Sequence, residues 1–387
     1  MDVFSDQDVT LLEDSAQRFV QTEVAPFLDV WEDAGEIPRG LYLRAAELGW
    51  LGLGYPEGLG GTPVPWRVRH ALTIALARAS GSGGLMASLF THNIGLPPLL
   101  RHGAPALQQK VVPEVLQGRK IAALAITEPG GGSDVAALRT TARREGDAYV
   151  IDGEKVFITS GMRADWLCVA VRTDSALKGA SGISMLMVPG DAPGLTRTAL
   201  RKMGWHCSDT ARLHFDGVRV PVSHRLGEEG AGFKMILTNF NGERLALSAM
   251  ALGFAQACFD EALDWARQRK TFGQPLIDHQ VIRHKLMDMK MRIDSTRAWL
   301  DAVTAQADAV PLGTEPGPQW VAQVCLLKNH ATQAMQFCAD QAVQILGGMG
   351  FMRGSRSERI YREVKVMMIG GGAEEIMKEL ASRQLGL

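Results

Sequence analysis

A glycine run flanked by hydroxyl side chains is the sharpest local signature of this chain. Residues 125–134 read AITEPGGGSD. A glycine run lets a ligand approach the backbone without meeting Cβ atoms. The free N–H groups, with the hydroxyls of Thr127 and Ser133, can donate hydrogen bonds to carbonyl and phosphate oxygens. The spacing does not fit the GxGxxG dinucleotide motif. Taken alone, the segment predicts either a ligand-binding loop or an ordinary glycine-rich loop.

An acid in the segment 240–245, FNGERL, is the second feature with chemical potential. A carboxylate that is buried beside a substrate has a raised pKa and can act as a general base. The ordinary alternative is a helix carboxylate that pairs with a nearby arginine, and Arg244 follows Glu243 directly. Its own neighbourhood favours the ion pair. Arg269, likewise, would on its own be interpreted as a solvated surface charge.

The first third of the chain has the sequence pattern of α-helices. Ser5, followed three residues later by Asp8, is typical of a helix N-terminus. Apolar residues then recur at helical spacing as far as about residue 117, with glycine-rich breaks at 58–61 and 81–84. We therefore expect an N-terminal α-helical domain over residues 1–120.

The pattern changes at about residue 121. Short apolar stretches then alternate with turn signals, and they cover residues 149–153, 155–159, 166–171, 183–188 and 211–215. Asp152-Gly153 and Asp216-Gly217 are dipeptides of the hairpin-turn kind. These features predict a middle β domain over residues 121–228, built as a small barrel or sandwich.

The helical period returns after Pro221 and lasts almost to the end of the chain. The predicted helices lie near 231–270, 278–308, 318–346 and 374–384, with a breaker-rich connection from Pro311 to Pro318. They are long enough for a C-terminal helical bundle over residues 229–387. The expected fold class is therefore α+β multidomain, in the order α, β, α.

The composition argues against several function classes. The 387 residues include 41 basic and 42 acidic side chains, so no basic excess exists to neutralise the phosphates of a nucleic acid. The five cysteines form no CxxC pair, which favours reduced thiols over a disulfide scaffold, and we expect no metal site. No signal-peptide pattern or apolar run of ~18 residues is present, so we expect a cytoplasmic protein without a membrane span.

Four segments in a fixed order carry a resemblance to a known family. They are TEPGGGSD at 127–134, KVFIT at 155–159, RKTFGQ at 269–274 with His279 and Gln280, and QILGGMGF at 344–351. In this combination the whole chain resembles the acyl-CoA dehydrogenase family. The resemblance implies an N-terminal α domain, a middle β domain and a C-terminal four-helix domain. It also implies FAD as cofactor and a homotetramer, with a dimer as the alternative.

The resemblance assigns expected cofactor contacts to individual residues. Positions that touch the flavin or the pantetheine of the substrate match Ile126, Thr127 and Ser133. The strand that backs the flavin matches Phe157, Ile158 and Thr159, with Phe157 where many members have tryptophan.

The dinucleotide part of FAD has its own matching positions. Contacts to the pyrophosphate and adenosine bound by the neighbouring subunit match Arg269, Thr271 and Phe272, and further dinucleotide positions match His279, Gln280, Gln344, Gly347 and Gly348. Glu375 stands at a frequent polar contact position for FAD. Ala373 replaces a common threonine, so we expect the loss of one hydroxyl contact.

One departure from the family concerns the catalytic base. Many members carry a glutamate at the position of Gly371, whereas residues 369–375 here read IGGGAEE. In the branch that resembles long-chain, isovaleryl- and citronellyl-CoA dehydrogenases, the base comes from a Glu-Arg-Leu site, which Glu243-Arg244-Leu245 matches. The resemblance thus implies Glu243 as base, Arg244 as its support, and the Gly371 N–H as a donor to the thioester oxygen. Asn241 and Gly372 match substrate-contacting positions.

The implied reaction is an FAD-dependent dehydrogenation of a saturated medium-, long- or branched-chain acyl-CoA to the trans-2-enoyl-CoA, as in β-oxidation. Glu243 would take the α-proton, FAD the β-hydride, and an electron-transfer flavoprotein the electrons. Two alternatives stay open. One is an acyl-CoA or nitroalkane oxidase on the same fold, and the other is a non-catalytic member that binds acyl-CoA.

Overall fold

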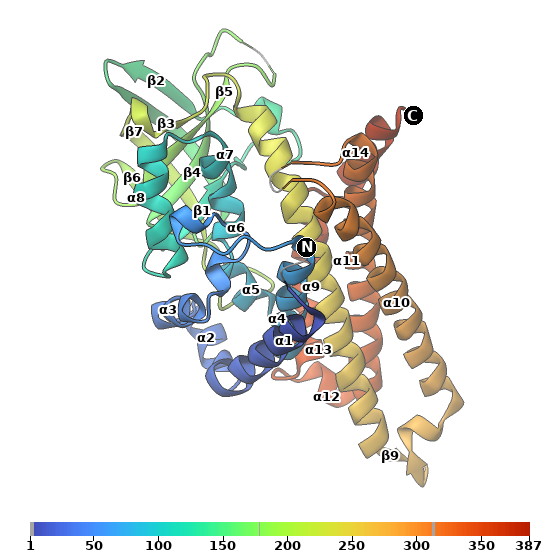
Figure 1. Ribbon diagram of the computed structural model, residues 1–387. Helices are drawn as coiled ribbons and strands as arrows, with labels where there is room; N and C mark the ends of the chain where they lie inside the picture. The colour runs from blue at the N-terminus through green and yellow to red at the C-terminus, as the bar shows by residue number, and fades with distance from the viewer. Residues whose placement is uncertain (1–3, 178, 312–313) are drawn as a thin grey trace.

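A helical N-terminal region begins the chain in the computed structural model, which describes residues 4–177, 179–311 and 314–387 (Figure 1). Its helices are α1 (Asp6–Phe19), α2 (Leu28–Ala34), α3 (Arg39–Glu47), α4 (Trp66–Ser80), α5 (Gly83–Leu89), α6 (His92–Gly95), α7 (Pro97–His102) and α8 (Pro105–Leu116). Ser5 caps α1, because its side chain accepts a hydrogen bond from the Asp8 N–H while the Asp8 carboxylate accepts one from the Ser5 N–H. The expected helix start is confirmed.

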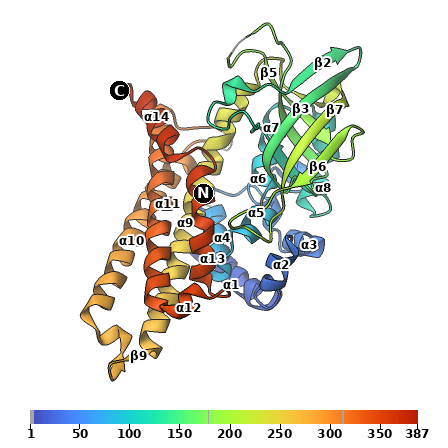
Figure 2. The same cartoon turned by 180° about the vertical axis from the view of Figure 1, so that it is seen from behind.

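The middle of the chain forms one mixed sheet. Its strands are β1 (Ala122–Ala125), β2 (Thr141–Glu145), β3 (Ala148–Thr159), β4 (Trp166–Arg172), β5 (Ile183–Pro189), β6 (Leu195–Ala199), β7 (Thr210–Pro221) and β8 (Arg225–Leu226). They follow the order β6-β7-β3-β2-β4-β5-β8, and β1 pairs in parallel with β4. Figure 2 shows this sheet beside the helical bundle, with α4 to α7 between them and with α2 and α3 below.

The two expected hairpin turns are wrong. Both dipeptides lie inside long strands, β3 and β7, which pair antiparallel with an irregularity between Ile151 and Gly153. The Gly217 N–H donates a 2.8 Å hydrogen bond to Asp152 Oδ1 across this irregularity. Residues that form turns can also form a β-bulge. Here Asp152-Gly153 of β3 lies opposite Asp216-Gly217 of β7. Both strands continue on either side of the bulge, and the chain does not reverse there.

A helical bundle closes the structure. Its helices are α9 (Gly232–Gln268), α10 (Gln280–Asp308), α11 (Pro318–Leu346), α12 (Gly348–Phe351), α13 (Arg356–Ile369) and α14 (Glu374–Leu385), and a small hairpin of β9 (Lys270–Thr271) and β10 (Gln274–Pro275) joins α9 to α10. The sequence pattern did not predict α13, whose buried face includes Glu358, Arg359 and Glu363. These buried charges interrupt the apolar stripe that identifies a helix. The fold class of helical, β and helical regions is confirmed, while the boundaries at 120 and 228 stay predictions.

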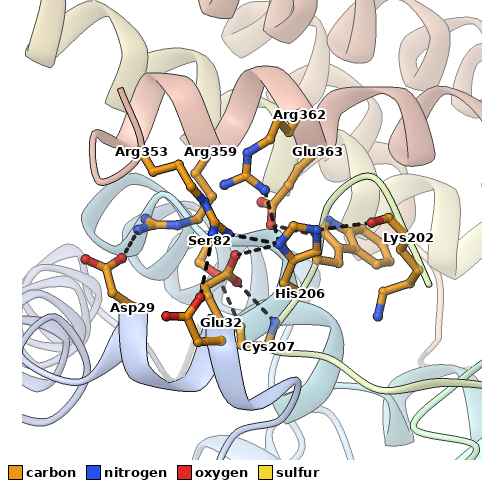
Figure 3. Close-up of polar contacts among 12 residues, drawn as sticks. Asp29, Glu32, Ser82, Lys202, His206, Cys207, Arg353, Arg359, Arg362 and Glu363 are labelled. Carbon is orange, nitrogen blue, oxygen red and sulfur yellow. Dashed lines mark hydrogen bonds and ion pairs between the residues drawn. The ribbon is translucent and has the colours of Figure 1, made fainter. Parts of the chain in front are cut away.

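A buried carboxylate joins the three regions. Glu363 of α13 accepts hydrogen bonds from the Gly83 N–H at the start of α5 (2.7 Å) and from the Trp205 N–H in the loop before β7 (2.9 Å). Burial and the neighbouring Glu32 raise the pKa of Glu363 to about 7. In Figure 3 the ring of His206 lies beside this carboxylate, with its Nδ1 facing Arg353 and Arg362. Residues from all three regions therefore fix the middle of α13, the helix that leads to Gly371.

A second buried charge anchors the glycine-rich loop. Lys155 of β3 is fully buried, and its ammonium donates hydrogen bonds to the Glu128 carboxylate (2.8 Å) and the Ile126 carbonyl (2.9 Å). Glu128 also accepts hydrogen bonds from the N–H groups of Arg139 and Thr140. These contacts hold both ends of the loop against the sheet. Among the described residues, no helix is long and apolar enough to cross a membrane.

Replacing the buried lysine should destabilise the fold. Lys155→Met leaves the Glu128 carboxylate buried without its cation, so we expect the free energy of unfolding to fall by about 3–5 kcal/mol. The double variant Glu128→Gln/Lys155→Met lacks the isolated charge and should lose less. Chemical denaturation measures both, and a single variant as stable as the wild type would contradict the role of the pair.

Candidate active site

Glu243 lies on α9 with one carboxylate oxygen cut off from solvent. The side chain as a whole is half-buried, but Oε2 is buried and has no hydrogen-bond partner among the described residues. The buried residues Asn239 and Leu247 lie one helical turn before and after it, on the same face. Burial raises the pKa of Glu243 to about 7, against the opposing charges of Arg244 and Lys328. A carboxylate in this state can accept a proton near neutral pH.

Gly371 faces this carboxylate from the connection between α13 and α14. A Cβ atom on Gly371 would lie 3.8 Å from Glu243 Oε1 and 3.0 Å from the Leu247 side chain. The backbone of Gly371 and Gly372 has positive φ angles of 68° and 116°, which favour glycine. The structure thus brings Glu243 and Gly371 together, and the acid on α9 points at the space that a side chain at position 371 would enter.

Arg244 supports the turn and makes no ion pair with Glu243 in the described part of the chain. Its Nε donates a 2.8 Å hydrogen bond to the Gly371 carbonyl, and its Nη1 donates a 2.9 Å bond to Asn241 Oδ1. Asn241 in turn donates to the Glu315 carboxylate at 3.0 Å. The ion-pair alternative for Glu243 is therefore not what the structure shows. Asn241, Arg244 and Gly372 lie in one network around the base.

The glycine-rich loop and β3 form a second group of expected contacts. The Val156 N–H donates to the Thr127 carbonyl at 2.8 Å and ties the loop to the strand. Phe157 is 69% exposed and has a φ of 61°, an unusual backbone for a non-glycine residue. Such strained residues gather at functional sites. Of the remaining expected contacts, Ile126 and Ile158 are buried, Thr127 and Thr159 are half-buried, and Ser133 is exposed.

The other expected FAD contacts lie at the opposite end of the bundle. At ~1.5 Å rise per residue, α9 separates Arg269 from Glu243 by about 39 Å. Figures 1 and 2 both place β9 and α12 at this far end. Phe272 is 98% exposed there, while His279 lies 3.2 Å from Thr271 Oγ1. This set comprises Arg269, Thr271, Phe272, His279, Gln280, Gln344, Gly347 and Gly348. Glu375 is exposed near the start of α14, away from that end.

The residues present fit a cofactor such as FAD. At Gly130, Gly131 and Gly348 an added Cβ would meet nothing within 4 Å, and none of the three has a positive φ. Neither packing nor backbone conformation within the chain requires glycine there. Close approach of a ligand to the backbone supplies a reason. The exposed ring of Phe157 offers a flat apolar surface beside the loop.

Sequence reasoning missed two residues beside the base. Lys328 of α11 is fully buried and donates hydrogen bonds to the connection that contains Gly371. Trp66, in the first turn of α4, has its ring 3.2 Å from the Cβ position of Gly242, so the glycine leaves room for the indole. A lysine inside an otherwise apolar helical stretch was the available signal for Lys328. Trp66 gave none, because its contact is formed only by the packing of α4 on α9.

Comparison with known proteins covers the whole chain. The domain descriptions "Acyl-CoA dehydrogenase, N-terminal domain", "middle domain" and "C-terminal domain" match residues 6–119, 123–218 and 230–386. The chain is 34% identical to a mitochondrial long-chain specific acyl-CoA dehydrogenase of Rattus norvegicus, covering 97% of this chain and 86% of the relative.

Solved structures agree over the same length. A probable acyl-CoA dehydrogenase from Mycobacterium abscessus superimposes with a TM-score of 0.94 at 44% identity, covering 99% of both chains. A glutaryl-CoA dehydrogenase from Mycobacterium smegmatis in complex with FADH2 has a TM-score of 0.89 at 25% identity, covering 98% of this chain and 95% of that one.

Removal of the buried charge should change how stability depends on pH. Folding raises the pKa of Glu243 from about 4.5 to about 7, so the folded state holds more protons than the unfolded state between these values. The ionised carboxylate therefore costs stability above pH 7. Relative to the wild type, Glu243→Gln should gain on the order of 3 kcal/mol in unfolding free energy between pH 5 and pH 8.

Urea denaturation at both pH values, on proteins matched in cofactor content, measures this gain. The exposed Glu57 provides the control, because Glu57→Gln should show a constant difference from the wild type. A pH-independent difference for Glu243→Gln would contradict a raised pKa.

Proposed function

This chain belongs to the acyl-CoA dehydrogenase family, and on that premise we propose that Glu243 removes the α-proton of a saturated acyl-CoA. The enzyme is an FAD-dependent oxidoreductase, as the family is. The observation that carries the proposal is the 3.8 Å separation between Glu243 Oε1 and the Cβ position of Gly371. The base on α9 reaches the space that the turn leaves open, and the product would be the trans-2-enoyl-CoA.

The residues around the thioester divide the work of proton removal. Glu243, with a pKa of about 7, is partly ionised at neutral pH and can take the proton. The Gly371 N–H would stabilise the negative charge that develops on the thioester oxygen. Arg244 donates a hydrogen bond to the Gly371 carbonyl and another to Asn241, which in turn donates to Glu315. These bonds fix the distance between the glycine turn and α9. Gly372 extends the turn beside the substrate.

The cofactor would be held by residues from both ends of the molecule. Thr127, Ser133, Phe157 and Thr159, with the backbone at Ile126 and Ile158, would contact the flavin of their own chain. Arg269, Phe272 and the residues near them would contact the dinucleotide of a neighbouring chain, because about 39 Å separates them from Glu243. When bound, FAD supplies the acceptor for the β-hydride.

An assembly of several copies follows from this division of contacts. Met287 and Met291 lie one turn apart on α10, and both are more than half exposed, so two apolar side chains face outward from the bundle. We propose a homotetramer, with a dimer as the alternative. An electron-transfer flavoprotein as acceptor and a cytoplasmic location stay predictions, as does the preference for medium-, long- or branched-chain acyl groups.

An oxidase is the main competing function, since an acyl-CoA or nitroalkane oxidase would use the same fold. Formation of hydrogen peroxide in air during substrate turnover would favour it. A non-catalytic acyl-CoA-binding protein would bind substrate without reducing the flavin. The raised pKa of Glu243, and an oxygen that has no partner within the described ranges, support a reactive carboxylate over this last alternative.

Substitution of the base should separate cofactor binding from chemistry. Glu243→Gln keeps the shape of the side chain and loses the proton acceptor, so the protein should retain its yellow cofactor and lose anaerobic bleaching by acyl-CoA. We expect a rate loss of at least about 100-fold. Absorbance at the flavin band after mixing with a panel of straight and branched acyl-CoAs measures it. Glu57→Gln should bleach normally, and normal bleaching by Glu243→Gln would remove Glu243 from the role of base.

Mixed oligomers should show whether two chains build one site. Arg269→Ala should weaken FAD binding by about 10- to 100-fold, because a charge-assisted hydrogen bond is lost. When Arg269→Ala chains are coexpressed with Glu243→Gln chains, some sites combine an intact Glu243 with an intact Arg269 from the other chain. Activity of the coexpressed oligomer should then exceed that of either variant alone. Absence of this recovery would place Arg269 outside the shared site.

A further inference from the structure

We propose that Lys328 is a positioning residue that holds the Gly370–Gly372 turn against Glu243 and places a fixed positive charge beside the base. The proposal rests on the proposed function of Glu243. Lys328 lies on α11, outside both the glycine-rich turn and the Glu-Arg-Leu segment. Its basis is the set of hydrogen bonds from one buried ammonium to the two ends of the turn.

The Lys328 ammonium spans the connection between α13 and α14. It donates 2.8 Å hydrogen bonds to the Met368 carbonyl, in the last turn of α13, and to the Gly372 carbonyl, just before α14. The lysine is 0% exposed, so its ammonium is directed at the turn and away from solvent. One cation therefore fixes the chain on both sides of Gly371.

Local structure does not hold this turn by itself. Gly370, Gly371 and Gly372 follow one another, and a glycine run loses much conformational freedom when it is ordered. Ala373 stands at the N-cap of α14, where no side chain caps the helix. The carbonyls at the end of α13 lack intrahelical partners. Lys328 supplies a partner for the Met368 carbonyl at the end of α13, and Arg244 holds the Gly371 carbonyl within the turn.

The charges around the base make Lys328 an electrostatic partner as well. Glu243 experiences the positive charges of Arg244 and Lys328. Lys328 is repelled by Arg244 and stabilised by the acidic groups Glu243, Glu374 and Cys325. Burial lowers the pKa of Lys328 to about 8, which leaves it mostly protonated at pH 7. Both cations oppose the effect of burial on Glu243. Loss of the Lys328 charge should therefore raise the pKa of Glu243 further.

Two variants separate the hydrogen bonds from the charge. Lys328→Met removes both, while Lys328→Gln removes the charge and keeps an N–H donor for a carbonyl of the turn. Lys365→Met is the matched control, because Lys365 lies on α13, contacts the Met368 sulfur at 3.8 Å and is exposed. Substitution of Lys365 should leave the rate and its pH dependence unchanged.

The pH profile of kcat/KM for acyl-CoA oxidation is the measurement, because its acid limb reports the base in the free enzyme. In Lys328→Met and Lys328→Gln the limb should move up by about one pH unit, which is the lower end of the effect of a nearby opposite charge. The plateau kcat should fall by about 100-fold in Lys328→Met, as expected for a displaced catalytic group, and by less in Lys328→Gln.

The results distinguish this inference from the proposed function. A wild-type acid limb in Lys328→Gln, together with a plateau kcat within twofold of the wild type, would overturn the role of Lys328 even if Lys328→Met failed to fold. If Lys328→Gln behaved like the wild type while Glu243→Gln was inactive, the assignment of Glu243 as base would stand. An active Glu243→Gln would instead remove the base, whatever the lysine variants did.

Discussion

A carboxylate oxygen that is buried with no hydrogen-bond partner among the described residues is the constraint on which this structure depends. Isolation of Glu243 Oε2 favours the protonated acid, and the cations of Arg244 and Lys328 limit that effect so that the group titrates near neutral pH. Burial alone would keep the acid protonated, and full pairing would make it a weak base. The carboxylate can reach a substrate only because Gly371 places no side chain in the space beside it.

Buried charges between the three regions keep Glu243 and the Gly371 turn in place. Glu363 connects α13 to the N-terminal helices and to the loop before β7, and the Lys155–Glu128 pair holds the glycine-rich loop to the sheet. Breaking such a pair is costly, because it leaves an uncompensated charge in the interior. The base on α9 and the turn before α14 thereby keep their positions, while Phe157 and Gly130 present exposed surface beside the sheet.

Much of the architecture could be predicted from the sequence, and the failures have physical reasons. Hydrophobic period gave the α, β, α order, but it could not detect α13, whose buried face carries charges. Turn dipeptides at 152–153 and 216–217 form a bulge, since local chemistry does not decide between reversal and bending. The sequence marks Glu243 as a candidate acid, but only the family resemblance assigns it the role of base. Lys328 and Trp66 depend on contacts between distant helices, which one sequence does not reveal.

A crystal structure with FAD and an unreactive acyl-CoA analogue tests the central claim most directly. We predict that a Glu243 carboxylate oxygen lies within about 3.5 Å of the carbon next to the thioester, the distance of a reactive arrangement. The Gly371 N–H should lie on the thioester oxygen, with the flavin ring on the other side of the acyl chain. An analogue bound with its thioester away from α9, and Glu243 facing only protein or water, would contradict it.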